Sequence, residues 1–208
     1  MINVDKNTFL DINLKAINKN YKIIKQIVSR KCIIAATVKA NAYGLGADQV
    51  VNSLIKKGCK YFFVATTNEA INLRKLNKKI FIFILNGLVT KELKNIRKFN
   101  LIPVINNLAQ LKKIENYQKE NNCFLNIAIH FDTGMSRLGL DQNETENLIK
   151  NKALLIKKSK LRLIMSHLSC ADDKKSKLNK IQLNKFNFTK IITPVRLAKI
   201  LKILYFHF

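Results

Sequence analysis

The segment VKANAYGLGA, from Val38 to Ala47, combines residue types that can bind and attack a small molecule. Lys39 follows six apolar or small residues. Burial makes a lysine amine easier to deprotonate, and the neutral amine is a nucleophile toward carbonyl compounds. Tyr43 stands four residues later and can reach a phosphate oxygen, while the glycines at 44 and 46 permit close approach of the backbone. Most lysines are solvated surface charges, so the case for Lys39 depends on the element that carries it.

Two further segments carry side chains that suit a binding site. HFDTGMSRLGL (130–140) contains Arg137, and MSHLSCADD (165–173) contains His167. An arginine can be a surface charge and a lone strand histidine is most often a satisfied core residue, so neither is diagnostic alone. The four cysteines are far apart and form no CxxC pair, which argues against a zinc site or a disulfide framework. We therefore expect no metal.

Strand-like and helical stretches alternate along the chain. Six short apolar runs have the length of buried strands, namely CIIAATVKA (32–40), YFFVAT (61–66), IFIFIL (80–85), LIPVI (101–105), FLNIAIHFD (124–132) and LRLIMSH (161–167). Apolar spacing and stop signals predict helices at residues 11–29, 47–57, 68–76, 90–99, 107–121, 142–156 and 176–190.

The alternation predicts the fold class. Strands that are apolar throughout are covered on both faces, which indicates a parallel sheet. A doubly wound sheet and a (β/α) barrel both fit, and the monotonous repeat without a G-x-G-x-x-G loop after the first strand favours the barrel. We predict an α/β fold, a partial (β/α)8 TIM-type barrel with about six parallel strands. Lys39 then ends a barrel strand, where barrel enzymes have their active sites.

Composition limits the partners. The 208 residues include 38 basic and 13 acidic residues, a formal net charge of +25, and 32 of the basic residues are lysines. The lysines are spread along the whole chain. AT-rich codons account for this bias better than nucleic-acid recognition, which favours arginine. Without an apolar run of membrane length or a visible signal peptide, we expect a cytoplasmic protein with no specific nucleic-acid or membrane partner.

The motifs resemble those of the alanine racemase family. VKANAYGLG looks like the family's pyridoxal 5′-phosphate attachment motif, HFDTGMSRLGL closely matches its DTGMxRLG motif, and MSHLSCADD matches its histidine-bearing sixth strand. Further similar segments follow the family's order: FLDINLKAINKNY (9–21), GCKYFFVATTNEAINLRKL (58–76) and FILNG (83–87). The single-domain pyridoxal-phosphate homeostasis proteins share the barrel, but their lysine motif differs from VKANAYG.

The resemblance implies an isomerase that interconverts L- and D-alanine for cell-wall precursor supply. Lys39 would hold the cofactor covalently and act as one of two catalytic bases. Tyr43 would bind the cofactor phosphate, and His167 would lie near the pyridine ring. Arg137 would contact the cofactor's phenolic oxygen and the substrate. The family often has a carbamylated lysine at the position of His130, and histidine cannot form that group.

The resemblance is expected to cover residues 1–187, an incomplete N-terminal barrel. Residues 188–208 are expected to be a basic apolar tail without family resemblance, helical from about Pro194. The family's later phosphate contacts, its C-terminal β-domain and its second base, a tyrosine that reaches across a homodimer, find no match here. We therefore expect a truncated racemase, inactive alone unless a separate chain completes it, whose dimerisation stays open. The alternatives are a pyridoxal-phosphate-binding module, a homeostasis-type barrel or a decayed gene product without function.

The unmatched second base leads to a prediction about activity. Racemisation removes a proton from one face of the α-carbon and returns one to the other, and Lys39 serves one face. We expect the interconversion of L- and D-alanine by this chain alone to stay at background in a coupled assay for D-alanine. A turnover number of about 1–10³ s⁻¹, the usual range for enzymes, would contradict the predicted truncation.

Overall fold

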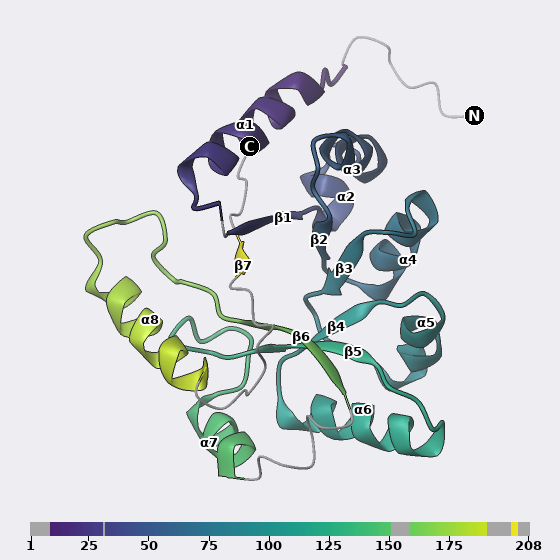
Figure 1. Ribbon diagram of the computed structural model, residues 1–208, viewed down its shortest axis with the longest axis vertical. Helices are drawn as coiled ribbons and strands as arrows, with labels where there is room; N and C mark the ends of the chain where they lie inside the picture. Colours follow the sequence, from purple (N-terminus) through teal and green to yellow (C-terminus); the bar gives the residue numbers. More distant parts are fainter. Residues whose placement is uncertain (1–8, 31, 151–158, 191–200, 204–208) are drawn as a thin grey trace.

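The structure is a computed structural model that describes residues 9–30, 32–150, 159–190 and 201–203 of the chain (Figure 1). Seven parallel strands form one curved sheet in the spatial order β6-β5-β4-β3-β2-β1-β7. The strands are β1 Ile33–Thr37, β2 Tyr61–Val64, β3 Phe81–Ile84, β4 Ile102–Ile105, β5 Asn126–His130, β6 Lys160–Met165 and β7 Leu201–Ile203. All six predicted strands are present, and the predicted partial parallel barrel is confirmed.

Helices lie around the outer side of the sheet (Figure 1). They are α1 Leu14–Ile27, α3 Ala47–Lys56, α4 Thr67–Leu76, α5 Leu93–Lys98 after the 3₁₀ turn η1 Thr90–Glu92, α6 Leu108–Glu120, α7 Gln142–Lys150 and α8 Lys177–Lys190. Each matches a helix predicted from the sequence, except that the end of the helix expected at 142–156 lies outside the described residues. The sequence did not predict α2, Lys39–Tyr43, because its backbone is unusual.

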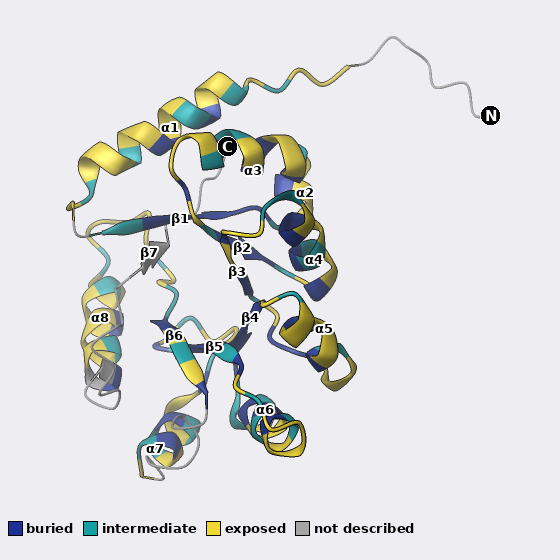
Figure 2. Ribbon diagram, turned by 45° about the vertical axis from the view of Figure 1, so that its right-hand side comes forward, coloured by how far each residue is buried: buried dark blue, intermediate teal, exposed yellow. Residues whose placement is uncertain are grey.

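Two apolar clusters lie on opposite faces of the sheet, because successive side chains of a strand point to opposite sides. Phe62 of β2 packs outward among the helices, whereas Phe63 points to the inner face. The inner cluster consists entirely of strand residues, namely Ala35, Phe63, Phe83, Ile102, Val104, Ala128, Leu163 and Met165. Most residues of β1 to β5 are buried, as the dark blue of these strands in Figure 2 shows. Burial on both faces explains why the strands read as continuous apolar runs.

The described part of the tail corrects one expectation. Residues 201–203 form β7, which pairs in parallel with β1, so the helix expected from about Pro194 is wrong for these residues. The physical reason is that β1 carries unpaired N–H and C=O groups on the side away from β2, and a short strand satisfies them. Pro194 and most of the tail lie outside the described residues.

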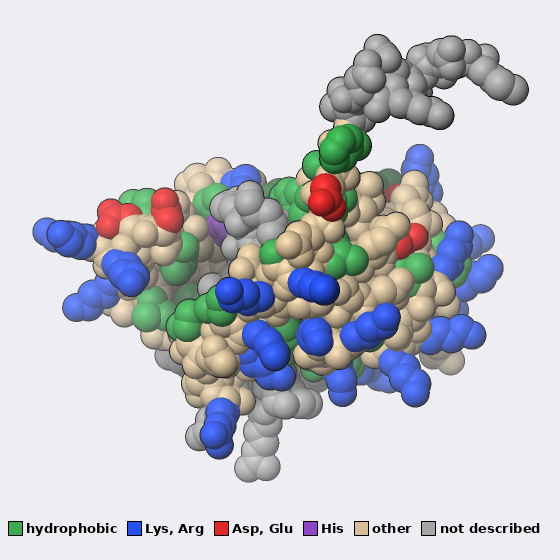
Figure 3. Space-filling view, turned by 90° about the horizontal axis from the view of Figure 1, so that it is seen from above, with side chains coloured by type: hydrophobic (Ala, Val, Ile, Leu, Met, Phe, Trp, Pro, Cys, Tyr) green, Lys and Arg blue, Asp and Glu red, His purple; other side chains and the backbone are tan. Residues whose placement is uncertain are grey.

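The surface charge of the molecule is not concentrated at one place. Lysine and arginine side chains are spread over the face seen in Figure 3 rather than gathered on one element. Among the described residues, no helix is both long and apolar enough to cross a membrane.

Arg74 of α4 is a buried cation that ties the outer helices to the sheet. Its side chain is 9% exposed, and burial lowers the pKa of the guanidinium. The guanidinium donates to five backbone carbonyls, those of Asn77, Lys78, Ile80, Phe99 and Asn100, at 2.8–3.3 Å. These carbonyls lie in the turns that lead into β3 and β4. One side chain therefore fixes where two strands begin.

Removing this guanidinium is expected to destabilise the barrel. Arg74→Met leaves one buried and four partly buried carbonyls without this donor, and we expect the free energy of unfolding to fall by about 3 kcal/mol. Urea unfolding followed by circular dichroism measures the change. Arg97→Met, at an exposed arginine of α5, is the control and is expected to stay within about 0.5 kcal/mol. Equal effects of the two substitutions would contradict the proposed role of Arg74.

Candidate functional site

The backbone turns left-handed directly after β1. The φ angles of Ala40, Asn41, Ala42 and Tyr43 are 50°, 54°, 54° and 56°. L-residues avoid this region, at a cost of roughly 1–2 kcal/mol each, and they rarely occupy it in succession. The surrounding structure must therefore hold this turn in place, and strain of this kind clusters at functional sites.

Asn41 connects the left-handed turn to the helix that follows. Its side-chain Oδ1 accepts a hydrogen bond of 2.8 Å from the backbone N–H of Ala47, the first residue of α3. Its backbone carbonyl accepts a bond of 2.9 Å from the N–H of Gly46. Asn41 therefore satisfies free donors at the start of α3 and fixes the distance between the turn and that helix.

Lys39 and Tyr43 stand at the two ends of this turn. The Lys39 ammonium lies over the Tyr43 ring, 5.8 Å from its centroid, which is within the range of a cation–π interaction. Tyr43 is 40% exposed. Burial raises the pKa of its hydroxyl, and the positive charge of Arg137 opposes that change. Tyr43 and Arg137, 94 positions apart in the sequence, are therefore brought within electrostatic reach of each other.

Hydrogen bonds from the backbone to Asp132 hold the loop that carries Arg137. The Asp132 carboxylate accepts bonds of 2.9–3.1 Å from the N–H groups of Gly134, Met135 and Ser136. Burial alone would raise the pKa of Asp132, but these N–H groups hold it below its usual value. The bonds fix the loop that ends β5 and leaves Arg137 exposed at its rim.

Gly139 closes this loop against β5. Its φ is 109°, and a Cβ atom there would lie 2.7 Å from the Asp132 nitrogen, closer than side-chain carbons come to backbone. The contact allows the Asp132 N–H to reach the Leu140 carbonyl at 2.9 Å, and the Leu140 N–H to reach the His130 carbonyl at 2.8 Å. Glycine is therefore required by close approach as well as by φ.

His167 follows β6 on the same side of the barrel. Its pKa is lowered first by burial, then by the positive charges of Arg137 and Lys39. Its backbone carbonyl accepts a bond of 3.0 Å from Gln182 of α8, which fixes the segment that carries it. Electrostatic interactions thus join all four residues predicted for the site, Lys39, Tyr43, Arg137 and His167, at the carboxyl ends of the strands.

His130 is buried and paired with Asn106, a residue that the sequence analysis missed. His130 Nδ1 lies 3.0 Å from Asn106 Oδ1. The Asn106 amide nitrogen donates to the carbonyls of Leu85 and Val104, at 2.9 and 3.2 Å, which fixes the orientation of the amide. Nδ1 of His130 must therefore carry the proton, which leaves Nε2 of the neutral ring as an acceptor. The feature of the sequence that could have indicated Asn106 is its position, as a polar residue directly after the apolar run at 101–105.

The charge state of His130 follows from its surroundings. Its pKa is lowered to about 4, chiefly by burial and further by the positive charges of His167 and Arg137, against the opposing charge of Asp132. His130 is therefore neutral near pH 7. A neutral imidazole beside Arg137 offers an acceptor and adds no positive charge.

Thr37, at the end of β1, carries a polar atom that suits a ligand. The side chain is 6% exposed, and its hydroxyl oxygen has no hydrogen-bond partner in the described part of the chain. Thr37 lies two residues after Ala35 of the inner cluster and two before Lys39, so it faces the inside of the barrel. Buried hydroxyls normally find a partner. An orphaned hydroxyl below Lys39 and Arg137 fits an anionic ligand with further polar groups.

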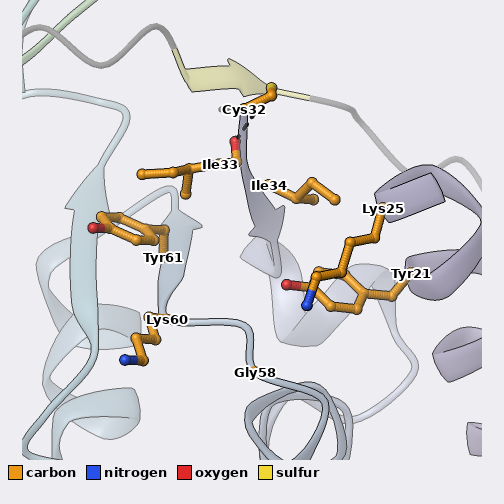
Figure 4. A pocket seen from close by; sticks show the side chains of 8 residues that line it. All are labelled: Tyr21, Lys25, Cys32, Ile33, Ile34, Gly58, Lys60 and Tyr61. Atoms are coloured by element: carbon orange, nitrogen blue, oxygen red, sulfur yellow. Dashed lines mark hydrogen bonds between the residues drawn. The ribbon is translucent and has the colours of Figure 1, made fainter. Parts of the chain in front are cut away.

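A cavity of about 160 Å³ lies at the opposite end of the first two strands (Figure 4). It is lined by Tyr21, Lys25, Cys32, Ile33, Ile34, Gly58, Lys60 and Tyr61. The strands begin at this end, so the cavity is separate from Lys39. Among the residues that the structure describes, no group of three or more His, Cys, Asp or Glu side chains could hold a metal ion.

A lysine, an arginine, a tyrosine and two histidines lie at one end of a parallel barrel, the end at which barrel enzymes have their active sites. The model of the alanine racemase N-terminal domain family matches residues 12–208, so the chain belongs to that family. The match includes the tail, for which no family resemblance was expected.

Known relatives agree with this assignment. The alanine racemase of Rickettsia prowazekii is 44% identical over 178 residues, which are 85% of this chain and 44% of that protein. The crystal structure of the Bartonella henselae alanine racemase with covalently bound pyridoxal phosphate matches with a TM-score of 0.83 and 34% identity, over 88% of this chain and 51% of that one. The chain spans about half the length of the curated relatives it matches.

The fold is shared beyond alanine racemases. A histidine racemase from Leuconostoc mesenteroides matches with a TM-score of 0.75 at 22% identity, over 88% of this chain and 49% of that one. A likeness at this identity shows the fold alone, so the fold by itself does not select alanine.

The neutral state of His130 leads to a prediction about stability. Its pKa is about 4 in the folded chain and about 6.5 when unfolded, so on acidification the unfolded chain takes up the proton first. The stability that the neutral histidine contributes is complete above about pH 6.5 and is lost as the pH falls towards 4, by about 2–3 kcal/mol. We expect His130→Gln to flatten the pH dependence in urea unfolding between pH 7 and pH 4.5.

His167→Gln is the comparison for that experiment. The pKa of His167 is lowered less, so its removal is expected to flatten the slope by less. An unchanged slope in His130→Gln would contradict a buried, neutral histidine bonded to Asn106.

Proposed function

We propose that this chain is the cofactor-binding part of an alanine racemase, that it binds pyridoxal 5′-phosphate through Lys39, and that the assembled enzyme interconverts L- and D-alanine. The observation that carries the proposal is the convergence of Lys39, Tyr43, Arg137 and His167 at one end of the barrel. It is supported by relatives described as alanine racemases and by one solved structure with covalently bound pyridoxal phosphate.

The residues present fit this cofactor. It combines an aldehyde, a phosphate and further ring substituents. Lys39 supplies an amine for the aldehyde, and Tyr43, whose ring lies beneath that amine, supplies a hydroxyl for a phosphate oxygen. Arg137 supplies positive charge for an anionic ring oxygen or the substrate carboxylate. The orphaned Thr37 hydroxyl offers one more hydrogen bond below Lys39.

Each residue has a defined task in the proposed mechanism. When bound, the cofactor supplies an electron sink for the charge that develops at the α-carbon of alanine. Lys39 moves the proton at that carbon on one face. Arg137 orients the carboxylate of alanine, and His130 gives it a neutral neighbour. His167 limits the space beside the ring.

Racemisation requires a second base on the opposite face, which we place in a partner polypeptide. The resemblance implies a tyrosine for this role, supplied across a homodimer by a part of the relatives that this chain does not match. We therefore propose that residues 1–187 bind the cofactor and supply the base on one face of the α-carbon. We place the assembled enzyme in the cytoplasm, where it supplies D-alanine for cell-wall precursors.

Selective capture of the cofactor at Lys39 tests the proposal. The chain is incubated with pyridoxal phosphate and reduced with borohydride, and the modified lysines are mapped by peptide mass spectrometry. We expect an absorbance change on binding and adduct mainly at Lys39. Lys39→Ala should abolish both, and Lys56→Ala, at an exposed lysine of α3, should leave both unchanged. Equal modification of Lys39 and surface lysines would contradict a formed cofactor site.

A further inference from the structure

Glu69 binds the ends of two strands at once. It stands in the first turn of α4, and one carboxylate oxygen accepts a bond of 2.7 Å from the N–H of Ala40, after β1. The other oxygen accepts bonds of 2.7 and 3.1 Å from the N–H groups of Ala65 and Thr66, after β2. Hydrogen bonds to an ionised acceptor are roughly twice as strong as neutral ones.

The bond between Glu69 and Ala40 is not part of the cap of α4. Thr66 caps α4, because its side-chain oxygen accepts a bond of 3.3 Å from the N–H of Glu69. The Glu69 carboxylate in turn accepts a bond from the N–H of Thr66. This reciprocal pair is a capping box, which needs no contact outside the helix. The bond to Ala40 reaches 29 positions back in the sequence. It has no role in α4, so its effect falls on the segment after β1.

That segment is the one that most needs support. Ala40 is the first of four successive left-handed residues, and Lys39 immediately precedes it. At Lys39 the chain passes from β1 into the left-handed turn. The Ala40 N–H belongs to the peptide plane that joins Lys39 to Ala40, so an acceptor on it restrains the ψ of Lys39 and the direction in which its side chain leaves the backbone. An acceptor on the Ala40 N–H stabilises this conformation against the ordinary ones.

We infer that Glu69 is a positioning residue for Lys39, because its carboxylate clamps the left-handed turn to the end of β2 and so fixes where the lysine amine lies. The effect on cofactor capture rests on the proposed function, whereas the effect on the turn does not. Glu69 touches neither the amine nor the reacting atoms, and it acts through the backbone of Ala40.

Glu69→Gln separates the two halves of the clamp. An amide has one acceptor oxygen, and its NH2 group cannot accept from an N–H. The oxygen is expected to stay with Ala65 and Thr66, which offer two donors, so Ala40 loses its acceptor. Thr66→Ala is the matched control, because it weakens the cap of α4 and keeps the carboxylate. Glu144→Gln is the second control, since Glu144 accepts a bond of 2.8 Å from the N–H of Leu108 at another helix start.

The first measurement is amide hydrogen exchange at residue resolution. We expect exchange of the Ala40 N–H to rise at least tenfold in Glu69→Gln and to stay within twofold in Thr66→Ala and Glu144→Gln. If Glu69→Gln does not fold, Glu69→Asp replaces it. Asp keeps the charge near α4 but is one methylene too short to hold both strand ends, so the same rise at Ala40 is expected.

The second measurement reports on the lysine itself and needs no cofactor. Trace acetylation of Lys39 relative to exposed Lys56, followed from pH 7 to pH 10, gives a reactivity profile. We expect the Lys39-to-Lys56 ratio to change at least threefold in Glu69→Gln and to stay constant in Thr66→Ala. Unchanged exchange at Ala40, an unchanged acetylation ratio, or an equal effect of Thr66→Ala would each overturn the inference.

Pyridoxal-phosphate capture separates this inference from the proposed function. If the exchange and acetylation results are as expected but the unsubstituted chain shows no selective capture at Lys39, the clamp stands and the proposed function fails. If the unsubstituted chain captures the cofactor selectively and Glu69→Gln does so equally fast, the proposed function stands and the clamp is overturned.

Discussion

The left-handed turn from Ala40 to Tyr43 is the constraint on which the candidate site depends. Four successive residues in an unfavourable region would revert to ordinary backbone without support. Support comes from Glu69 on one side, through the Ala40 N–H, and from Asn41 on the other, through the start of α3. The turn places the Lys39 ammonium over the Tyr43 ring.

The candidate site also depends on the parallel barrel, because the barrel brings the ends of distant strands to one place. Lys39 follows β1, His130 ends β5 and His167 follows β6. Polar side chains then join the neighbouring strand ends pairwise. Glu69 joins the ends of β1 and β2, Asn106 joins β4 to β5, and Asp132 shapes the loop after β5. The apolar clusters on the two sides of the sheet keep the strands in register beneath this layer.

The charge balance at the barrel mouth suits an anionic ligand. Lys39 and Arg137 bring positive charge, and their fields lower the pKa of His167 after burial has already lowered it. Burial keeps His130 neutral as well. The two histidines therefore contribute shape and hydrogen-bonding atoms without adding repulsion between cations. Asp132 is occupied by backbone N–H groups, so its negative charge orders the loop instead of neutralising the lysine.

The sequence by itself determined the strands, the helices, the parallel barrel and the family, because these follow from apolar periodicity and from motifs that are continuous along the chain. It also placed Lys39 at the end of the first strand. The tertiary structure alone decided the left-handed turn, the clamp by Glu69, the Asn106–His130 pair and the five carbonyls around Arg74. The clamp, the Asn106–His130 pair and two of the five bonds of Arg74 join residues that lie 24–29 positions apart, and no local pattern encodes which groups a folded sheet will bring to a given side chain. The strand at 201–203 also depends on the tertiary structure, since it pairs with the edge of β1, which lies some 170 positions earlier in the sequence.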